Sequence, residues 1–186
     1  HTTICIMEMG KSPVNVKFEV PLYVTMAAKS GDPEMATPDG YDISNAAAPG
    51  ADSYDIGVTS MKIQALGDWA IVDTGTPLDL PTQMKFSIGG CDIPAVTKTD
   101  GVKEVPLSGD FVNSDKPKAI APGKSLSGKP EGLALKGEIK AQNRTDKKAA
   151  AQFKITYIVA ALSGTGEALG SVYVGDDKTA AGFSTP

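Results

Sequence analysis

The chain has 186 residues, of which 41% are hydrophobic and 22% are charged, enough for one large domain with a sizeable core. Its net charge of −4 and its single arginine, Arg144, argue against nucleic acid as a partner, because nucleic-acid-binding domains carry basic, arginine-rich patches. The 20 Gly and 13 Pro are scattered, which favours many short strands over long helices. No apolar run approaches the ~20 residues of a membrane-spanning helix, so we expect no membrane insertion.

The first predicted element is a strand over residues 2–9. Its apolar residues lie on both faces, which is typical of a strand that is buried on both sides or packs against something outside its own sheet. There are two alternatives: the strand pairs within its own domain, or it adds to the sheet of a neighbouring subunit. The residues of this predicted assembly strand are Ile4, Cys5, Ile6, Met7 and Met9.

Residues 14–26 give the strongest periodic signal. Hydrophobic side chains occupy every second position, which predicts a long strand with one buried face. Pro21 lies on the outward-facing parity and has no N–H group, so we expect this part of the strand to be at a sheet edge or a bulge.

The later predicted strands are short. Apolar alternation runs through Tyr54, Ile56 and Val58 and then changes phase, which predicts a β-bulge near Thr59–Ser60. Further strands are expected around residues 69–72, 84–88, 102–107, 133–141, 153–161 and 172–174. About ten strands at this spacing predict an all-β fold, a two-sheet antiparallel sandwich of the Ig-like or jelly-roll-like kind.

We assign the whole chain, residues 1–186, to a single domain. Residues 109–132 form a long excursion, rich in proline and glycine, that has the composition of a linker. We place no domain boundary there, because neither flanking part holds an obviously complete set of strands.

The two cysteines, Cys5 and Cys91, permit one disulfide, which would fit an oxidising compartment. Two unpaired, buried thiols are the alternative. Neither cysteine lies in a Cys-x-x-Cys motif, and the single histidine, His1, cannot complete a Cys/His zinc site. We expect no metal ligands and no cofactor. The alternative is a calcium site in a loop, formed by Asp32, Asp39 and Asp42 or by Asp52 and Asp55, although these residues match no EF-hand spacing.

The turn Asp73-Thr74-Gly75 resembles the catalytic turn of pepsin-like aspartic proteases. That chemistry needs two carboxylates about 3 Å apart that share a proton, so a chain with one such turn would have to act as a homodimer. The alternative is a strand that ends in a glycine turn, with the Asp73 side chain capping it. Serine and cysteine triads are disfavoured because His1 is the only histidine base. We expect no catalytic residue.

Two features concern glycans. Asn143-Arg144-Thr145 has the form of a glycosylation sequon, and Asn143 would sit at a polar hairpin tip. Tyr23 and Tyr173 could form an exposed aromatic face that binds a carbohydrate or another ligand.

Four short segments form an ordered series: an extended strand at 18–27, the segment Tyr41-Asp42-Ile43-Ser44-Asn45, a strand at 56–60 and the Trp-containing segment 68–71. In this order they resemble the secreted surface proteins of Gram-positive bacteria related to the WxL group. The resemblance covers roughly residues 1–75. It implies a β-sandwich fold, a secreted location and a role at the cell surface. Trp69-Ala70-Ile71 has isoleucine where the name-giving leucine of that group stands, so peptidoglycan attachment through this motif is not implied.

These observations favour a non-enzymatic, extracellular structural or adhesive surface protein, such as a self-assembling fibre or lattice subunit. The expected partners are further copies of the chain, other cell-surface proteins or glycans, with no nucleic acid. The first alternative is a carbohydrate- or ligand-binding module. The second is a homodimeric aspartic protease that uses Asp73.

Overall fold

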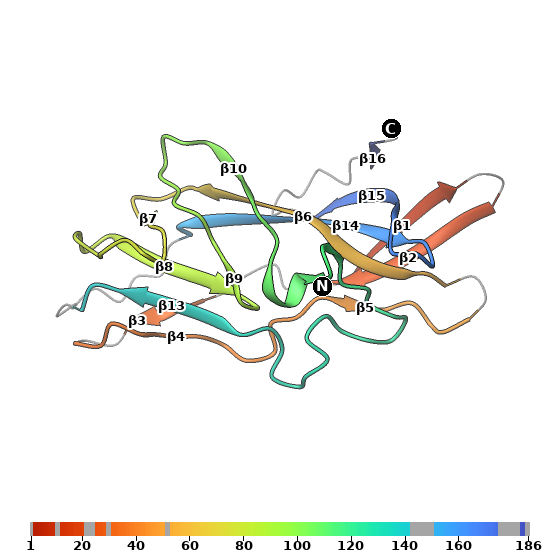
Figure 1. Ribbon diagram of the computed structural model, residues 1–186, viewed down its shortest axis with the longest axis horizontal. Helices are drawn as coiled ribbons and strands as arrows, with labels where there is room; N and C mark the ends of the chain where they lie inside the picture. Colours follow the sequence, from red (N-terminus) through yellow and green to blue (C-terminus); the bar gives the residue numbers. More distant parts are fainter. Residues whose placement is uncertain are drawn as a thin grey trace.

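Figure 1 shows the computed structural model of the chain, which describes residues 2–9, 12–20, 25–28, 31–50, 53–141, 151–174 and 183–184. Within these ranges the chain forms strands, turns and one short 3₁₀ helix, η1 (Gly109–Phe111), and no α-helix. The all-β prediction is therefore confirmed. The strands are, in chain order, β1 (Thr2–Met9), β2 (Ser12–Glu19), β3 (Ala27–Ala28), β4 (Met35–Ala36), β5 (Ser44–Asn45), β6 (Asp55–Ala65), β7 (Ala70–Ile71), β8 (Gln83–Ile88), β9 (Cys91–Asp92), β10 (Val102–Val105), β11 (Val112–Asn113), β12 (Lys116–Pro117), β13 (Leu135–Ile139), β14 (Phe153–Leu162), β15 (Ala168–Val174) and β16 (Phe183–Ser184).

The described strands are distributed over five sheets. The largest has the order β10-β6-β14-β15-β16, and the next has the order β13-β8-β7, with β9 also paired to β8. A smaller sheet has the order β1-β2-β5, and β3-β4 and β11-β12 form two-stranded pairs. The pairing of β7 with β8 is parallel, and the other pairings between these strands are antiparallel. There are more strands than the roughly ten predicted, because strands of two residues carry no detectable alternation.

The centre of the largest sheet is the antiparallel pair of β6 and β14. The register shifts between Ile158 and Val159, which pair with Ser60 and Val58 and leave Thr59 as an extra residue. This confirms the bulge predicted near Thr59–Ser60. The bulge moves the buried face of β6 from even-numbered to odd-numbered residues, and the fully buried ones are Ile56, Val58, Met61 and Ile63.

The long strand predicted over residues 14–26 is shorter in the structure. β2 ends at Glu19 and β3 begins only at Ala27, so the predicted extent was wrong. Residues 21–24 lie outside the described ranges. The end of the strand is consistent with the chemistry of Pro21, which has no N–H to donate to a sheet ladder.

One hydrophobic core cluster gathers side chains from the larger sheets and from the excursion at 109–132. Phe111, Ile120 and Leu126 of the excursion are each at most 1% exposed. Ile120 is joined to Ile56 of β6 by two backbone hydrogen bonds of 2.7 and 3.1 Å. The excursion therefore packs against the strands instead of running past them as a linker.

Candidate functional site

A groove of about 340 Å³ lies where the bulge of β6, the end of β10 and the β11–β12 hairpin meet. This volume is at the lower end of the range of small-ligand sites, about 300–1,000 Å³. Its apolar lining consists of Val105, Leu107, Val112 and Pro117. Its polar lining consists of Thr59, Ser60, Asp115 and Lys116.

Two hydroxyl-bearing residues of the bulge, Thr59 and Ser60, line the groove. Thr59 Oγ1 donates to the carbonyl oxygen of Ile158 at 3.2 Å, and Ser60 Oγ donates to Oε2 of Glu104 at 2.8 Å. The hydrogen bond from Ser60 and the ammonium of Lys62, 3.0 Å from Oε1, lower the pKa of Glu104. Because both hydroxyl protons are engaged, the two side chains can only accept further hydrogen bonds.

The β11–β12 hairpin forms the opposite wall. Its two central residues, Ser114 and Asp115, have φ angles of 49° and 64°, in the left-handed region. Residues with a side chain adopt this region at a cost of roughly 1–2 kcal/mol each. Nζ of Lys116 donates to Oε1 of Glu167 at 2.9 Å and to the carbonyl oxygen of Thr165 at 3.0 Å. The hairpin is thereby tied to the turn between β14 and β15, and the charge of its lysine is compensated.

The lining of the groove suits binding better than catalysis. It combines apolar walls, two hydroxyl groups, one carboxylate and one paired ammonium, and it contains no histidine or cysteine. Elsewhere in the described part of the chain, no three His, Cys, Asp or Glu side chains gather closely enough to hold a metal ion.

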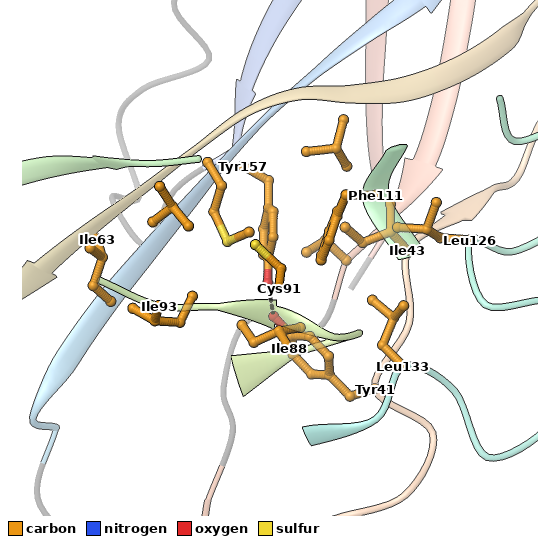
Figure 2. Packing of buried hydrophobic residues seen from close by; sticks show 14 of the residues in the cluster. Tyr41, Ile43, Ile63, Ile88, Cys91, Ile93, Phe111, Leu126, Leu133 and Tyr157 are labelled. Carbon is orange, nitrogen blue, oxygen red and sulfur yellow. Dashed lines mark hydrogen bonds between the residues drawn. The ribbon is translucent and has the colours of Figure 1, made fainter. Parts of the chain in front are cut away.

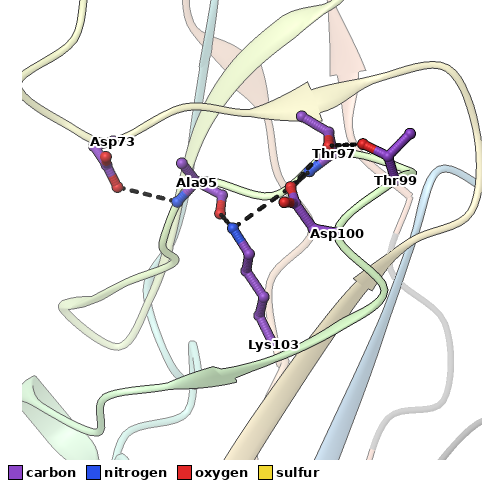
Figure 3. Close-up of polar contacts among 6 residues, drawn as sticks. All are labelled: Asp73, Ala95, Thr97, Thr99, Asp100 and Lys103. Carbon is purple, nitrogen blue, oxygen red and sulfur yellow. Dashed lines mark hydrogen bonds and ion pairs between the residues drawn. The ribbon is translucent and has the colours of Figure 1, made fainter.

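The Asp73-Thr74-Gly75 turn follows β7. Asp73 is exposed, and its Oδ1 accepts a hydrogen bond from the backbone N–H of Ala95 at 3.0 Å (Figure 3). Nζ of Lys103 donates to the carbonyl oxygen of Ala95 at 2.9 Å, so both backbone groups of this residue are held. The Asp73 carboxylate thus fixes the neighbouring loop at Ala95, whereas the capping alternative placed it on its own turn. That turn is closed by a backbone hydrogen bond from the N–H of Thr76 to the carbonyl oxygen of Asp73 at 2.9 Å. The protease alternative requires a second copy of the chain and stays a prediction.

A polar pair lies inside the core. The hydroxyl groups of Tyr41 and Tyr157 point toward each other at 2.6 Å (Figure 2). Burial raises the pKa of Tyr41 to about 12 and raises the pKa of Tyr157 well above its usual value. Phe111 stacks on Tyr157, with ring centroids 6.2 Å apart. Each buried hydroxyl is therefore satisfied by the other.

Cys91 is buried near this pair and carries a free thiol, which donates to the carbonyl oxygen of Pro106 at 3.3 Å. A buried, unpaired thiol is what the second of the two cysteine alternatives expects. The side chain of Cys5 lies outside the described residues, so the disulfide between Cys5 and Cys91 stays a prediction.

The tyrosine pair predicts a loss of stability at alkaline pH. Unfolded tyrosine ionises near pH 10, whereas burial keeps the pKa of Tyr41 at about 12 and that of Tyr157 also raised. Above about pH 10 the unfolded state therefore binds fewer protons than the folded state, and the free energy of unfolding falls as pH rises toward about 12. Urea unfolding between about pH 8 and pH 11 measures this fall.

The matched control is the double variant Tyr41→Phe/Tyr157→Phe, which removes both hydroxyls without leaving one unpaired. Its free energy of unfolding should fall less steeply above about pH 10. An equally steep fall in the double variant would assign the alkaline loss to other groups.

Several predicted site residues lie outside what the structure describes. Asn143 and Tyr23 are outside the described ranges, and only the backbone of Tyr173 is described. Only the backbone is described as well for the residues of the predicted assembly strand, which are Ile4, Cys5, Ile6, Met7 and Met9. The roles of all these residues stay predictions.

The groove itself was missed by the sequence analysis. The bulge that forms one wall was predicted, but the hairpin that forms the other wall has serine and aspartate at its turn. A two-residue hairpin turn is recognised mainly by Asn-Gly, Asp-Gly or Gly-Gly. No signal of that kind marks residues 113–116.

The chain matches no protein-family model, no curated protein and no solved structure. Within the described ranges, no helix is long and apolar enough to cross a membrane.

Proposed function

We propose that the chain is a non-enzymatic structural or adhesive protein of the cell surface, which assembles through its N-terminal strand. The proposal keeps the secreted location implied by the resemblance to the WxL-related proteins. The β-rich fold supports it. So does the scarcity of histidine, the side chain that most often acts as a general acid or base, since His1 is the only one.

We further propose that the two largest sheets are the layers of one antiparallel sandwich. In Figure 1, β6 and β14 lie above β8 and β13. The strands β8 and β13 alternate between buried and more exposed positions, as expected of a sheet with one face on a core. Both sheets contribute to the same core cluster, through residues that include Met61, Ile63, Phe86 and Ile88.

The position of β1 carries the assembly proposal. β1 pairs with β2 over its whole length, from Thr2↔Glu19 to Met9↔Ser12, so it pairs within its own chain on one side. In the described part of the chain it is the outer strand of the sheet β1-β2-β5. An outer strand directs a row of N–H and C=O groups away from its neighbour, and a strand of another molecule can pair with that row.

The sequence of β1 adds an apolar contribution to such pairing. Ile4 and Ile6 share one parity, and Cys5, Met7 and Met9 share the other. Burying three or four side chains of this size contributes on the order of 5–10 kcal/mol before ordering costs are subtracted. That is enough to hold an assembly together.

We expect the double variant Ile4→Lys/Ile6→Lys to remain folded and to become monomeric. Lysine on an edge strand opposes pairing with another edge, because the charge would have to be buried or placed beside its copy. Analytical ultracentrifugation and negative-stain microscopy measure assembly, and thermal unfolding measures whether the fold is kept.

The single variant Asp79→Lys is the control. It changes the net charge by the same two units at an exposed position outside β1, and it removes no apolar side chain. It should still assemble. The proposal fails if the unmodified chain is monomeric at high concentration, or if the lysine double variant still polymerises.

A further inference from the structure

The groove between β6, β10 and the β11–β12 hairpin has a one-sided polarity. The hydroxyl protons of Thr59 and Ser60 are given to Ile158 and Glu104, so these two hydroxyls present only acceptor capacity to a ligand. The carboxylate of Asp115 is an acceptor as well. A ligand that fits this polar lining must therefore bring hydrogen-bond donors.

The charge of the groove points in the same direction. Lys116 is the one cation of the lining, and its ammonium is held by Glu167 and by the carbonyl oxygen of Thr165. Asp115 lines the groove as an exposed carboxylate. Because Glu167 compensates the charge of Lys116, the uncompensated charge of the groove is the negative charge of Asp115. A cationic ligand would complement this charge.

The shape of the lining adds an apolar requirement. Val105 is buried, and Leu107, Val112 and Pro117 are half-buried around the same cavity. A small cationic ligand without an apolar part would leave these four side chains exposed to water. A ligand with an aliphatic stem would cover them, as the stem of lysine does when it lies along apolar surface and extends its ammonium to a polar partner.

We infer that this groove binds a lysine side chain of a partner polypeptide. The stem lies against the apolar walls, and the ammonium group is received by Asp115 and by the hydroxyl oxygens of Thr59 and Ser60. Ammonium donates three hydrogen bonds and accepts none, which matches a set of acceptors. The groove does not include β1, so the test of this inference is independent of the test of the assembly proposal.

The strained hairpin turn is consistent with this role. Asp115 keeps a φ angle of 64°, a conformation in which glycine or asparagine would be less strained. Strained backbone persists when the surrounding structure holds it, and it is concentrated at sites of function. Asp115 is the acidic residue among those that line the groove.

The test is an NMR titration of the full chain with Nα-acetyl-lysine methylamide, followed through backbone amide shifts. We expect saturable shifts at residues of the groove with a millimolar Kd. The matched ligand, Nα-acetyl-norleucine methylamide, has the same aliphatic stem and no ammonium, and it should give no saturable shift. Raising the salt concentration should weaken the binding of the lysine ligand, because the groove is open to solvent.

The matched variants are Asp115→Asn and Asp79→Asn. Asparagine tolerates the left-handed region, so Asp115→Asn keeps the turn and removes only the charge. It should raise the Kd about fivefold, the value of one partly exposed ion pair. Asp79→Asn neutralises an exposed aspartate outside the groove and should leave the Kd unchanged. The inference is overturned if the norleucine ligand binds as tightly as the lysine ligand, or if Asp115→Asn binds the lysine ligand as tightly as the unmodified chain does. Glucose is titrated as a further probe for the carbohydrate-binding alternative, and the same shifts with glucose would also overturn the inference.

Discussion

Replacing Gly132 with alanine is expected to lower the free energy of unfolding by at least about 3 kcal/mol. Gly132 has a φ angle of 81°, which alanine adopts only with strain. A Cβ atom built at this position would lie 2.5 Å from the carbonyl oxygen and 2.9 Å from the nitrogen of Tyr41. Both are backbone atoms in the bridge between these two residues, so neither can move aside as a flexible side chain would.

Gly128→Ala is the control for this prediction. Gly128 has a similar φ angle of 66°, but a Cβ atom there would have nothing within 4 Å. In the control, the free energy of unfolding should fall only by the cost of the backbone conformation, about 1 kcal/mol. Urea unfolding of both variants separates steric overlap from backbone strain. Equal losses in the two variants would show that the contact with Tyr41 relaxes without cost.

Replacing Phe111 with alanine is expected to cost about 3–5 kcal/mol. Phe111 is fully buried and stacks on Tyr157 of β14, so its removal leaves a cavity beside the tyrosine pair. Phe111→Leu keeps most of the volume and should cost clearly less. The free energies come from urea unfolding followed by tryptophan fluorescence and by circular dichroism.

The same experiment tests the assignment of the chain to one domain. If the excursion at 109–132 belongs to the same cooperative unit as the sheets, both probes should move together to lower urea concentration in the Phe111→Ala variant. Two separated transitions, only one of them shifted by the substitution, would place the excursion and the sheets in different units.

The parts of the fold that were predictable are those with regular alternation. β8 and β14 were recognised because apolar and polar residues alternate in their sequences, and in β8 every second residue is indeed buried. In β14 burial does not follow the alternation, since all residues from Tyr157 to Leu162 are buried. The phase change at Thr59 could be predicted because the bulge leaves the apolar spacing on either side intact. The end of β2 was missed because apolar residues continue at the same parity beyond Glu19, and the pattern alone does not show where pairing stops.

The groove was less predictable for a physical reason. It depends on Lys116 being held by Glu167, on two hydroxyls whose partners lie on other strands, and on a turn with positive φ at Asp115. Each of these is a contact between residues far apart in the chain or a conformation uncommon for the residue type. A single sequence without relatives does not reveal contacts of that kind.

The pairing of β6 with β14 has a consequence for synthesis. The paired residues nearest in sequence, Ala65 and Phe153, are separated by nearly half of the chain, and the pair farthest apart joins Asp55 and Leu162. At about 5–20 residues per second, a ribosome needs several seconds to add the intervening segment. During that time β6 can pair with β10 but lacks its other partner, β14. The middle of the largest sheet therefore cannot be completed before β14 has been synthesised.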